Sequence, residues 1–271
     1  MRPLCRQAGF TLIELVAAIV ILGILATATS KIVVFGTQIY VEANDRQQVL
    51  SKSRFIVERL SRELKTAIPN SIRVRNDNTC IQFIPIEASG AYRDDASATP
   101  PPIVPTTGDT LDVISWNAIG AANVGDRLYI YGTQESHFYT DTDHYSVVDN
   151  ITGTNPEYQI TFTDSDGYAE ASPRERYYMG DHTVNFCISS GNIYRYVTSG
   201  IPSTQPTAAT AATSGVLMAE GLTNDLVTEP PFSYHAGALF RNSVVNLYLE
   251  FNANVNENMF FNQEVHIPNV P

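Results

Sequence analysis

Basic residues are scarce in this chain of 271 residues. It has 17 Lys and Arg against 28 Asp and Glu, which gives a net charge of -11 at pH 7. A surface that binds phosphate backbones is generally cationic, so the composition argues against a free-standing nucleic-acid-binding protein. The scarcity is also uneven, because residues 1–75 hold 11 of the basic and five of the acidic residues. Six basic and 23 acidic residues remain for residues 76–271, a net charge of -17, so the chain has two differently built parts.

Motifs of catalytic and cofactor chemistry are also missing. The five histidines are His137, His144, His182, His235 and His266. They form no HExxH and no pairing with cysteine at ligand spacing, so no zinc site is predicted. The sequence contains no GxSxG, GxxxxGK or GxGxxG, and the hydrolase and nucleotide-binding interpretations therefore lack a motif. Asp164 and Asp166 alternate as in a calcium loop, but the third alternating ligand is missing, which favours a plain Asx turn. We expect no enzyme, no metal and no cofactor.

A long apolar stretch lies close to the amino end. Residues 1–9 carry two arginines and no acidic residue, and the apolar stretch 10–35 follows at once. As a helix this stretch would be ~39 Å long, enough to cross a bilayer of ~30 Å with some tilt. Basic flanks tend to stay in the cytoplasm, so we expect the chain after residue 36 to lie outside.

The apolar stretch has two interpretations. The small residues at 26–30, ATATS, could serve as the cleavage site of an ordinary secretory signal peptide. Glu14 argues against this, because a carboxylate within an apolar membrane segment is costly and normally indicates a function or a partner. We therefore favour a retained segment.

Residues 9–15 read GFTLIEL. A short basic leader that ends in Gly9, the aromatic Phe10 and the acidic Glu14 together resemble the processing motif of the type IV pilin family. This family includes pilins, minor pilins and the pseudopilins of type II secretion. The resemblance implies that a prepilin peptidase cleaves between Gly9 and Phe10, and that the new amino group of Phe10 is methylated.

The expected role of Glu14 follows from electrostatics. A carboxylate buried among the apolar helices of a filament needs a partner, and the amino terminus of a neighbouring subunit is the natural one. We expect Glu14 to set the axial register during assembly. The alternative is a carboxylate that only lies at the level of the lipid headgroups.

A second helical segment is expected over residues 36–68, with no proline between Phe10 and Ile68. Its apolar or small residues recur every three or four positions: Val49, Ser53, Ile56, Leu60, Leu64 and Ala67. Basic residues occupy the other faces. We interpret them as a solvated face, or one that meets acidic heads of neighbours, rather than as a DNA-binding stripe. Together residues 10–68 would form a helix of ~88 Å.

The remainder of the chain has the period of β-strands from Thr79 onward. The expected strands span residues 79–86, 110–116, 126–132, 158–163, 183–188, 192–198, 243–251 and 263–267. They predict an antiparallel sheet packed on the helix, an α+β class, and by resemblance a type IV pilin fold. Segments 88–108 and 199–215 are rich in proline or of low complexity, so we expect long loops there and a mobile one in the second case.

Cysteine is rare, with three residues. Removal of the leader would remove Cys5 and leave Cys80 and Cys187 outside the membrane, in an oxidising compartment. Each lies in an expected strand, so we predict a disulfide between them; two buried thiols are the alternative.

Four further stretches carry a finer resemblance. They are VNFCISSGNIYRY at 184–196, VLMAEGLTNDL at 216–226, and the closing segments 231–251 and 263–271. These resemble the large minor pilins of the PilW type and pseudopilin J. The resemblance implies a structural and assembly protein, made of a leader (1–9), a membrane and filament-core helix (10–35), an amphipathic stalk (36–68) and a periplasmic head (69–271).

The resemblance also implies a location and a set of partners. The location is the inner membrane, crossed once, and then the tip of a pilus or a low-copy position in it. The partners are the prepilin peptidase, the inner-membrane assembly platform, other minor pilins and the major pilin; nucleic acid is not expected. A minor pseudopilin of type II secretion and a pilus-tip adhesin are the alternatives.

Overall fold

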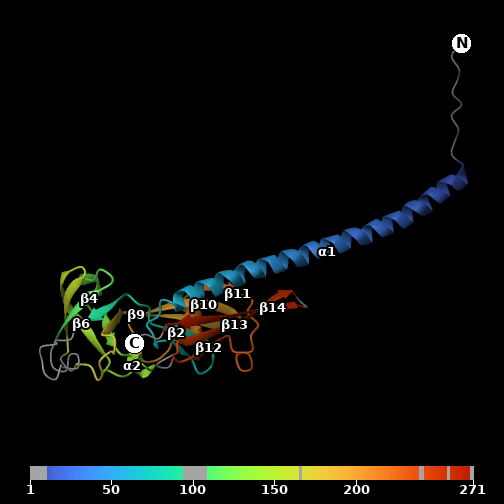
Figure 1. Cartoon of the computed structure of the whole chain (residues 1–271). Coiled ribbons are helices and arrows are strands. Elements are labelled where there is room, and N and C mark those ends of the chain that lie inside the picture. The colour runs from blue at the N-terminus through green and yellow to red at the C-terminus, as the bar shows by residue number, and fades with distance from the viewer. Residues whose placement is uncertain (1–10, 94–108, 165–166, 238–240, 255–256, 269–271) are drawn as a thin grey trace, which may run out of the picture. The chain divides into compact units, whose positions relative to one another are not determined.

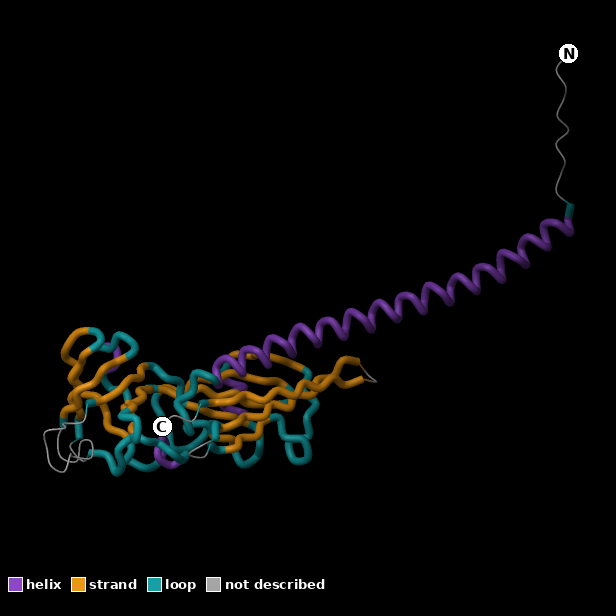
Figure 2. Tube along the Cα trace, in the orientation of Figure 1, coloured by secondary structure: helices purple, strands orange, loops and turns teal. Residues whose placement is uncertain are grey.

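The computed structural model describes residues 11–93, 109–164, 167–237, 241–254 and 257–268. The chain divides into two compact units, residues 1–48 and residues 49–271. We call them the amino-terminal unit and the head unit. Helix α1 (Leu12–Leu64) contributes to both, and Figure 2 shows the strands of the described residues, with their connecting loops, in the head unit.

The carboxy-terminal part of α1 packs in the head unit through one face. Ser53, Ile56, Leu60 and Leu64 are fully buried, as the spacing of three and four residues predicts. The predicted end of the helix at residue 68 is wrong by four residues. The N–H groups of Thr66 and Ala67 donate to carbonyls three residues back, at 3.0 and 3.1 Å, so the last turn tightens and the helix stops.

Two antiparallel sheets share a core with this helix. The first has the strand order β1 (Arg73–Val74), β2 (Cys80–Phe83), β9 (His182–Ser189), β10 (Asn192–Ser199) and β11 (Val216–Glu220). The second consists of β12 (Phe232–His235), β13 (Ser243–Asn254) and β14 (Glu257–Ile267). Both contribute side chains to the core that contains Leu60.

Strand β9 shows how the first sheet is built. Val184, Phe186 and Ile188 lie in the core with Leu60, whereas Cys187 lies in a separate cluster on the opposite face, as the alternation of a strand requires. A two-residue turn at Ser190 and Gly191, with φ of 51° and 73°, joins β9 to β10. Such turns fit the twist of a hairpin and favour glycine.

A closed barrel lies between β2 and β9 in the sequence. Its strand order is β3 (Ala88–Tyr92), β4 (Thr110–Ser115), β7 (Glu157–Phe162), β6 (Tyr145–Thr154), β5 (Arg127–Ile130) and β8 (Arg176–Gly180). The short helices η1 (Ala121–Asn123) and α2 (Ser136–Tyr139) lie in its connections. The barrel has its own apolar core, and Figure 1 shows β4 and β6 at one end of the head unit, with β10 and β13 nearer the other.

The α+β class and the antiparallel sheets confirm the prediction, and the long apolar helix with its β-rich head is consistent with a type IV pilin fold. Each expected strand overlaps an observed one. The barrel was not predicted, and strands β1, β3, β6, β8, β11 and β12 lie where no strand was expected. The prediction of a mobile loop over residues 199–215 is wrong for its second half, which forms helix α3 (Ala208–Ser214) with Ala211 fully buried.

Candidate functional site

The amino-terminal end of α1 carries the predicted assembly residues. Gly9 and Phe10 lie outside the described residues. Glu14 lies in the first turn of α1, exposed, and its N–H donates to the hydroxyl of Thr11 at 3.4 Å. A carboxylate in a first turn also interacts favourably with the positive end of the helix dipole. The helix therefore starts at Leu12, two residues before Glu14, and the carboxylate is exposed.

The amino-terminal unit exposes an unusual amount of apolar surface. From Leu12 to Val41, every large apolar side chain is at least half exposed. A soluble monomer rarely exposes a contiguous apolar patch larger than a few hundred Å². This part of α1 is also long and apolar enough to cross a membrane. It therefore anchors the chain in a membrane and leaves the head unit soluble.

Three threonine hydroxyls of this stretch are bonded within the helix. The hydroxyls of Thr27 and Thr37 donate to carbonyls three residues back, both at 2.8 Å, and that of Thr29 donates to Leu25 at 2.5 Å. In lipid an unpaired hydroxyl would be costly, because no water replaces the lost hydrogen bond. These bonds satisfy three hydroxyls that would otherwise be unpaired in a hydrocarbon environment.

An ion pair joins α1 to the first sheet of the head unit. Arg195 on β10 donates through Nε to both carboxylate oxygens of Glu63, at 3.1 and 2.9 Å. Arg59, one turn earlier on α1, also contacts Glu63, whose side chain is only 14% exposed. Arg195 is the arginine of the motif at 184–196, and its contact with the helix was not predicted.

Other basic side chains of the stalk also face acidic partners. Arg62 pairs with Glu58 at 2.8 Å, as their spacing of four residues predicts, and Lys52 lies 3.7 Å from Glu220. These pairs support the interpretation of a solvated face over that of a nucleic-acid stripe.

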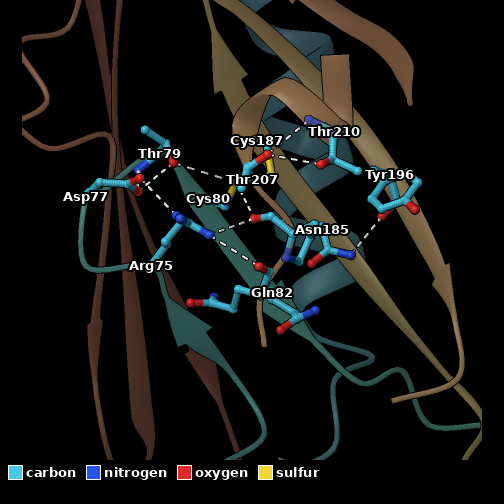
Figure 3. Close-up of a disulfide and its surroundings, with 12 residues drawn as sticks. Arg75, Asp77, Thr79, Cys80, Gln82, Asn185, Cys187, Tyr196, Thr207 and Thr210 are labelled. Atoms are coloured by element: carbon cyan, nitrogen blue, oxygen red, sulfur yellow. Dashed lines mark hydrogen bonds and ion pairs between the residues drawn. A yellow bond between two sulfur atoms is a disulfide. The ribbon is translucent and has the colours of Figure 1, made fainter. Parts of the chain in front are cut away.

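The expected bond between Cys80 and Cys187 is present in the structure. The two residues lie directly opposite each other on β2 and β9, with Cα atoms 4.1 Å apart, and both are fully buried. Helix α3 covers them, because Ala211 packs in the same cluster. Figure 3 shows the bond beside Thr207, whose hydroxyl accepts from the N–H of Thr210 at 3.2 Å and caps α3.

Two arginines fix the segment that leads into α3. Arg73 is 5% exposed and donates to the carbonyls of Pro202 and Ser203 at 3.2 and 3.0 Å. Arg75 donates to the carbonyls of Gln205 and Pro206, both at 3.2 Å. These bonds hold a low-complexity segment against the disulfide face of the sheet.

Two groups of side chains in the described part of the chain are of metal-ligating types. One consists of His137, Asp141 and His144, and the other of Glu87, Asp181 and His182. Burial lowers the pKa of His137, and the neighbouring His144 lowers it further. The possible calcium ligand Asp166 lies outside the described residues.

The amino end matches a known sequence family. Residues 4–30 match the model of the prokaryotic N-terminal methylation motif. The chain carries a type IV pilin-like prepilin signal. Such a signal implies processing by a prepilin peptidase and entry into the assembly machinery of pilin-like proteins, which are structural rather than catalytic. No curated protein and no solved structure matches the chain.

Proposed function

We propose that this pilin-like protein is a minor pilin that takes part in the initiation or the tip of a type IV pilus of the mannose-sensitive haemagglutinin type. The observation that carries the proposal is the prepilin signal directly before a membrane-length apolar helix and a large β-rich head. The choice of this pilus rests on a resemblance of the cysteine placement and the carboxy-terminal segments to those of its minor pilin MshO.

The proposed maturation divides the chain into four parts. Prepilin peptidase removes the leader 1–9 between Gly9 and Phe10, and Phe10 is N-methylated. Residues 10–35 first anchor the subunit in the inner membrane and then enter the filament core. Residues 36–68 form the stalk, and residues 69–271 form a periplasmic head. The burial of one face of α1 up to Leu64 supports this division.

Glu14 would act when the subunit leaves the membrane for the filament. Among apolar helices its carboxylate is stabilised only by a positive partner, which the amino group of Phe10 in a neighbouring subunit supplies. The pairing would fix the axial position of each subunit. The other partners are the assembly platform, other minor pilins and the major pilin.

Charge favours a low-copy position over self-polymerisation. Without the leader the chain has 15 basic and 28 acidic residues, a net charge of -13. Residues 10–75 carry +4 and the remainder -17. Heads with this charge repel one another around a filament, so a single position at the tip is favoured.

Complementation of a deletion strain tests the proposal. We compare the wild type, Glu14→Val and the matched control Glu42→Val, which changes an exposed glutamate of the same helix. Mass spectrometry should show a mature chain that begins at methylated Phe10 in all three. Glu14→Val should insert in the membrane but reach sheared pili at least about tenfold less, because an unpaired buried charge is left behind. Equal incorporation of the two variants would refute the role of Glu14.

The phenotype of the deletion separates the candidate functions. Loss of surface pili while the major subunit is still made supports priming of assembly. Normal piliation with lost attachment would instead indicate a tip adhesin. Lost export of secreted enzymes with normal pili would indicate a pseudopilin of type II secretion.

A further inference from the structure

The segment HFYTDTDH at residues 137–144 comprises the last three residues of α2 and the tight turn that leads from α2 to β6. The N–H groups of Thr140 and Asp141 both donate to the carbonyl of Ser136, at 3.0 and 2.8 Å. The carbonyl of His144 then accepts from the N–H of Ile130 on β5, at 3.2 Å. The turn is thereby fixed against the barrel, and it brings together three side chains at positions i, i+4 and i+7.

These three side chains are His137, Asp141 and His144. Each offers a ligand atom, and the three atoms all lie within 4.8 Å of one another. The two histidines are 7% and 5% exposed, whereas the Asp141 side chain is 35% exposed and leaves an approach from solvent. The group is therefore buried on its histidine side and open to solvent at its carboxylate.

Hydrogen bonding within the turn leaves His144 incompletely paired. Its Nδ1 atom is buried and has no hydrogen-bond partner among the described residues, and its Nε2 atom lies 4.0 Å from a carboxylate oxygen of Asp141. A buried polar atom without a partner is costly, and a bound water or a metal ion can satisfy it. The ring of His137, by contrast, is hydrogen-bonded at both nitrogens, because Nδ1 accepts from the N–H of Thr133 at 3.4 Å and Nε2 lies 2.7 Å from the amide nitrogen of Gln134.

We propose that His137, Asp141 and His144 bind one divalent transition-metal ion of the zinc class. Two imidazoles and one carboxylate are a ligand set that suits this ion, with water in the fourth position. Calcium is disfavoured, because it takes six to eight oxygen ligands and this site offers a single carboxylate.

Binding requires a local rearrangement of side chains. The two rings stack with centroids 3.5 Å apart and planes within 6°, so the lone pairs of their nitrogens run side by side and do not converge. One ring must turn about its χ2 angle, which is a soft torsion. The amide of Gln134, whose nitrogen lies 2.7 Å from Nε2 of His137, moves aside if that atom is the ligand. The bound ion would then tie α2 to the start of β6.

Metal titration of the full chain in detergent micelles tests the site. After treatment with a chelator and its removal, Zn²⁺ is titrated by calorimetry and Co²⁺ by its visible absorption. The wild type should bind one ion, show the intense absorption of tetrahedral cobalt and unfold at a higher temperature with zinc. Asp141→Asn should weaken zinc binding by at least about tenfold, and His144→Asn should abolish it and the cobalt spectrum.

Two controls and a folding check keep the result clear. Asp143→Asn changes an exposed carboxylate of the same turn, and His182→Asn removes the histidine of the other group of metal-ligating side chains. Both variants should bind zinc with the affinity of the wild type. Circular dichroism in the presence of chelator must show that every variant is folded. If His144→Asn does not fold, the comparison of Asp141→Asn with the wild type decides. Absence of binding by the wild type, or equal binding by Asp141→Asn and Asp143→Asn, would overturn the proposal.

Discussion

Removal of the disulfide should cost a large part of the stability of the head unit. Cys80 and Cys187 are 107 residues apart, so their bond closes a loop that contains the whole barrel. For a loop of this length the chain-entropy model gives ~4.8 kcal/mol at 25 °C. Alanine fits in both buried positions without new polar groups, so the double variant Cys80→Ala, Cys187→Ala should lose about 4 to 5 kcal/mol of unfolding free energy.

Urea unfolding with tryptophan fluorescence measures this loss. The chain has a single tryptophan, Trp116, which follows β4 in the barrel and lies within the closed loop. The denaturant dependence of the unfolding free energy should increase in the variant, because its unfolded chain is less compact and exposes more surface. The wild type in reducing agent should behave as the variant does, and the variant should not respond to reducing agent.

The result that would contradict this reasoning is specific. A loss below about 1 kcal/mol, with an unchanged denaturant dependence, would mean that the unfolded chain is already constrained without the bond. The loop-closure argument would then be wrong for this protein, and the role of Cys80 and Cys187 would lie in local packing under α3.

Three further predictions concern the head unit. Glu63→Gln should cost about 1 to 3 kcal/mol, because it leaves Arg195 without its charged partner, and a double-mutant cycle of the two residues should show the coupling. Ala211→Leu should cost about 1 to 3 kcal/mol by overpacking the space above the disulfide, whereas Ala209→Leu on the exposed side of α3 should stay within about 0.5 kcal/mol. His137 has a lowered pKa in the folded chain, so below about pH 6.5 the unfolded chain binds the proton more readily. In chelator the unfolding free energy should therefore fall as the pH drops through this value, and His137→Gln should flatten that dependence.

Long, periodic segments could be predicted from the sequence alone. The buried face of α1 follows from the spacing of Ile56, Leu60 and Leu64, because a helix places such residues on one side whatever packs against them. The disulfide could be predicted because only two cysteines follow the leader. The roles of Gly9 and Phe10 stay predictions, since both lie outside the described residues.

The barrel could not be predicted, because its closure depends on pairings between distant residues. Strand β3, for example, pairs Gly90 with Ser115 on one side and with Tyr177 on the other. No local pattern encodes such a pairing. Strand β6 alternates buried and half-buried side chains only in its first four residues, so it carries a weak strand signal.

The site residues that were missed did leave signals in the sequence. Helix α3 is rich in alanine, which has the highest helix propensity, and it follows the capping Thr207, whereas the low-complexity composition of residues 199–215 favours a loop. The proposed ligands His137, Asp141 and His144 follow one another at spacings of four and three residues. The HExxH template does not describe this spacing. Proximity there depends on the turn geometry, which only the structure supplies.

The position of the disulfide also determines how a pulled subunit would respond to force. Tension applied between α1 and the carboxy-terminal strands passes from β2 to β9 through the covalent bond, because Cys80 and Cys187 lie opposite each other. The loop of 107 residues is left out of this mechanical path. At about 3.5 Å per residue, ~370 Å of chain is thereby withheld from extension. The barrel is mechanically shielded, and a head unit under tension would keep it folded after the rest of the head had yielded.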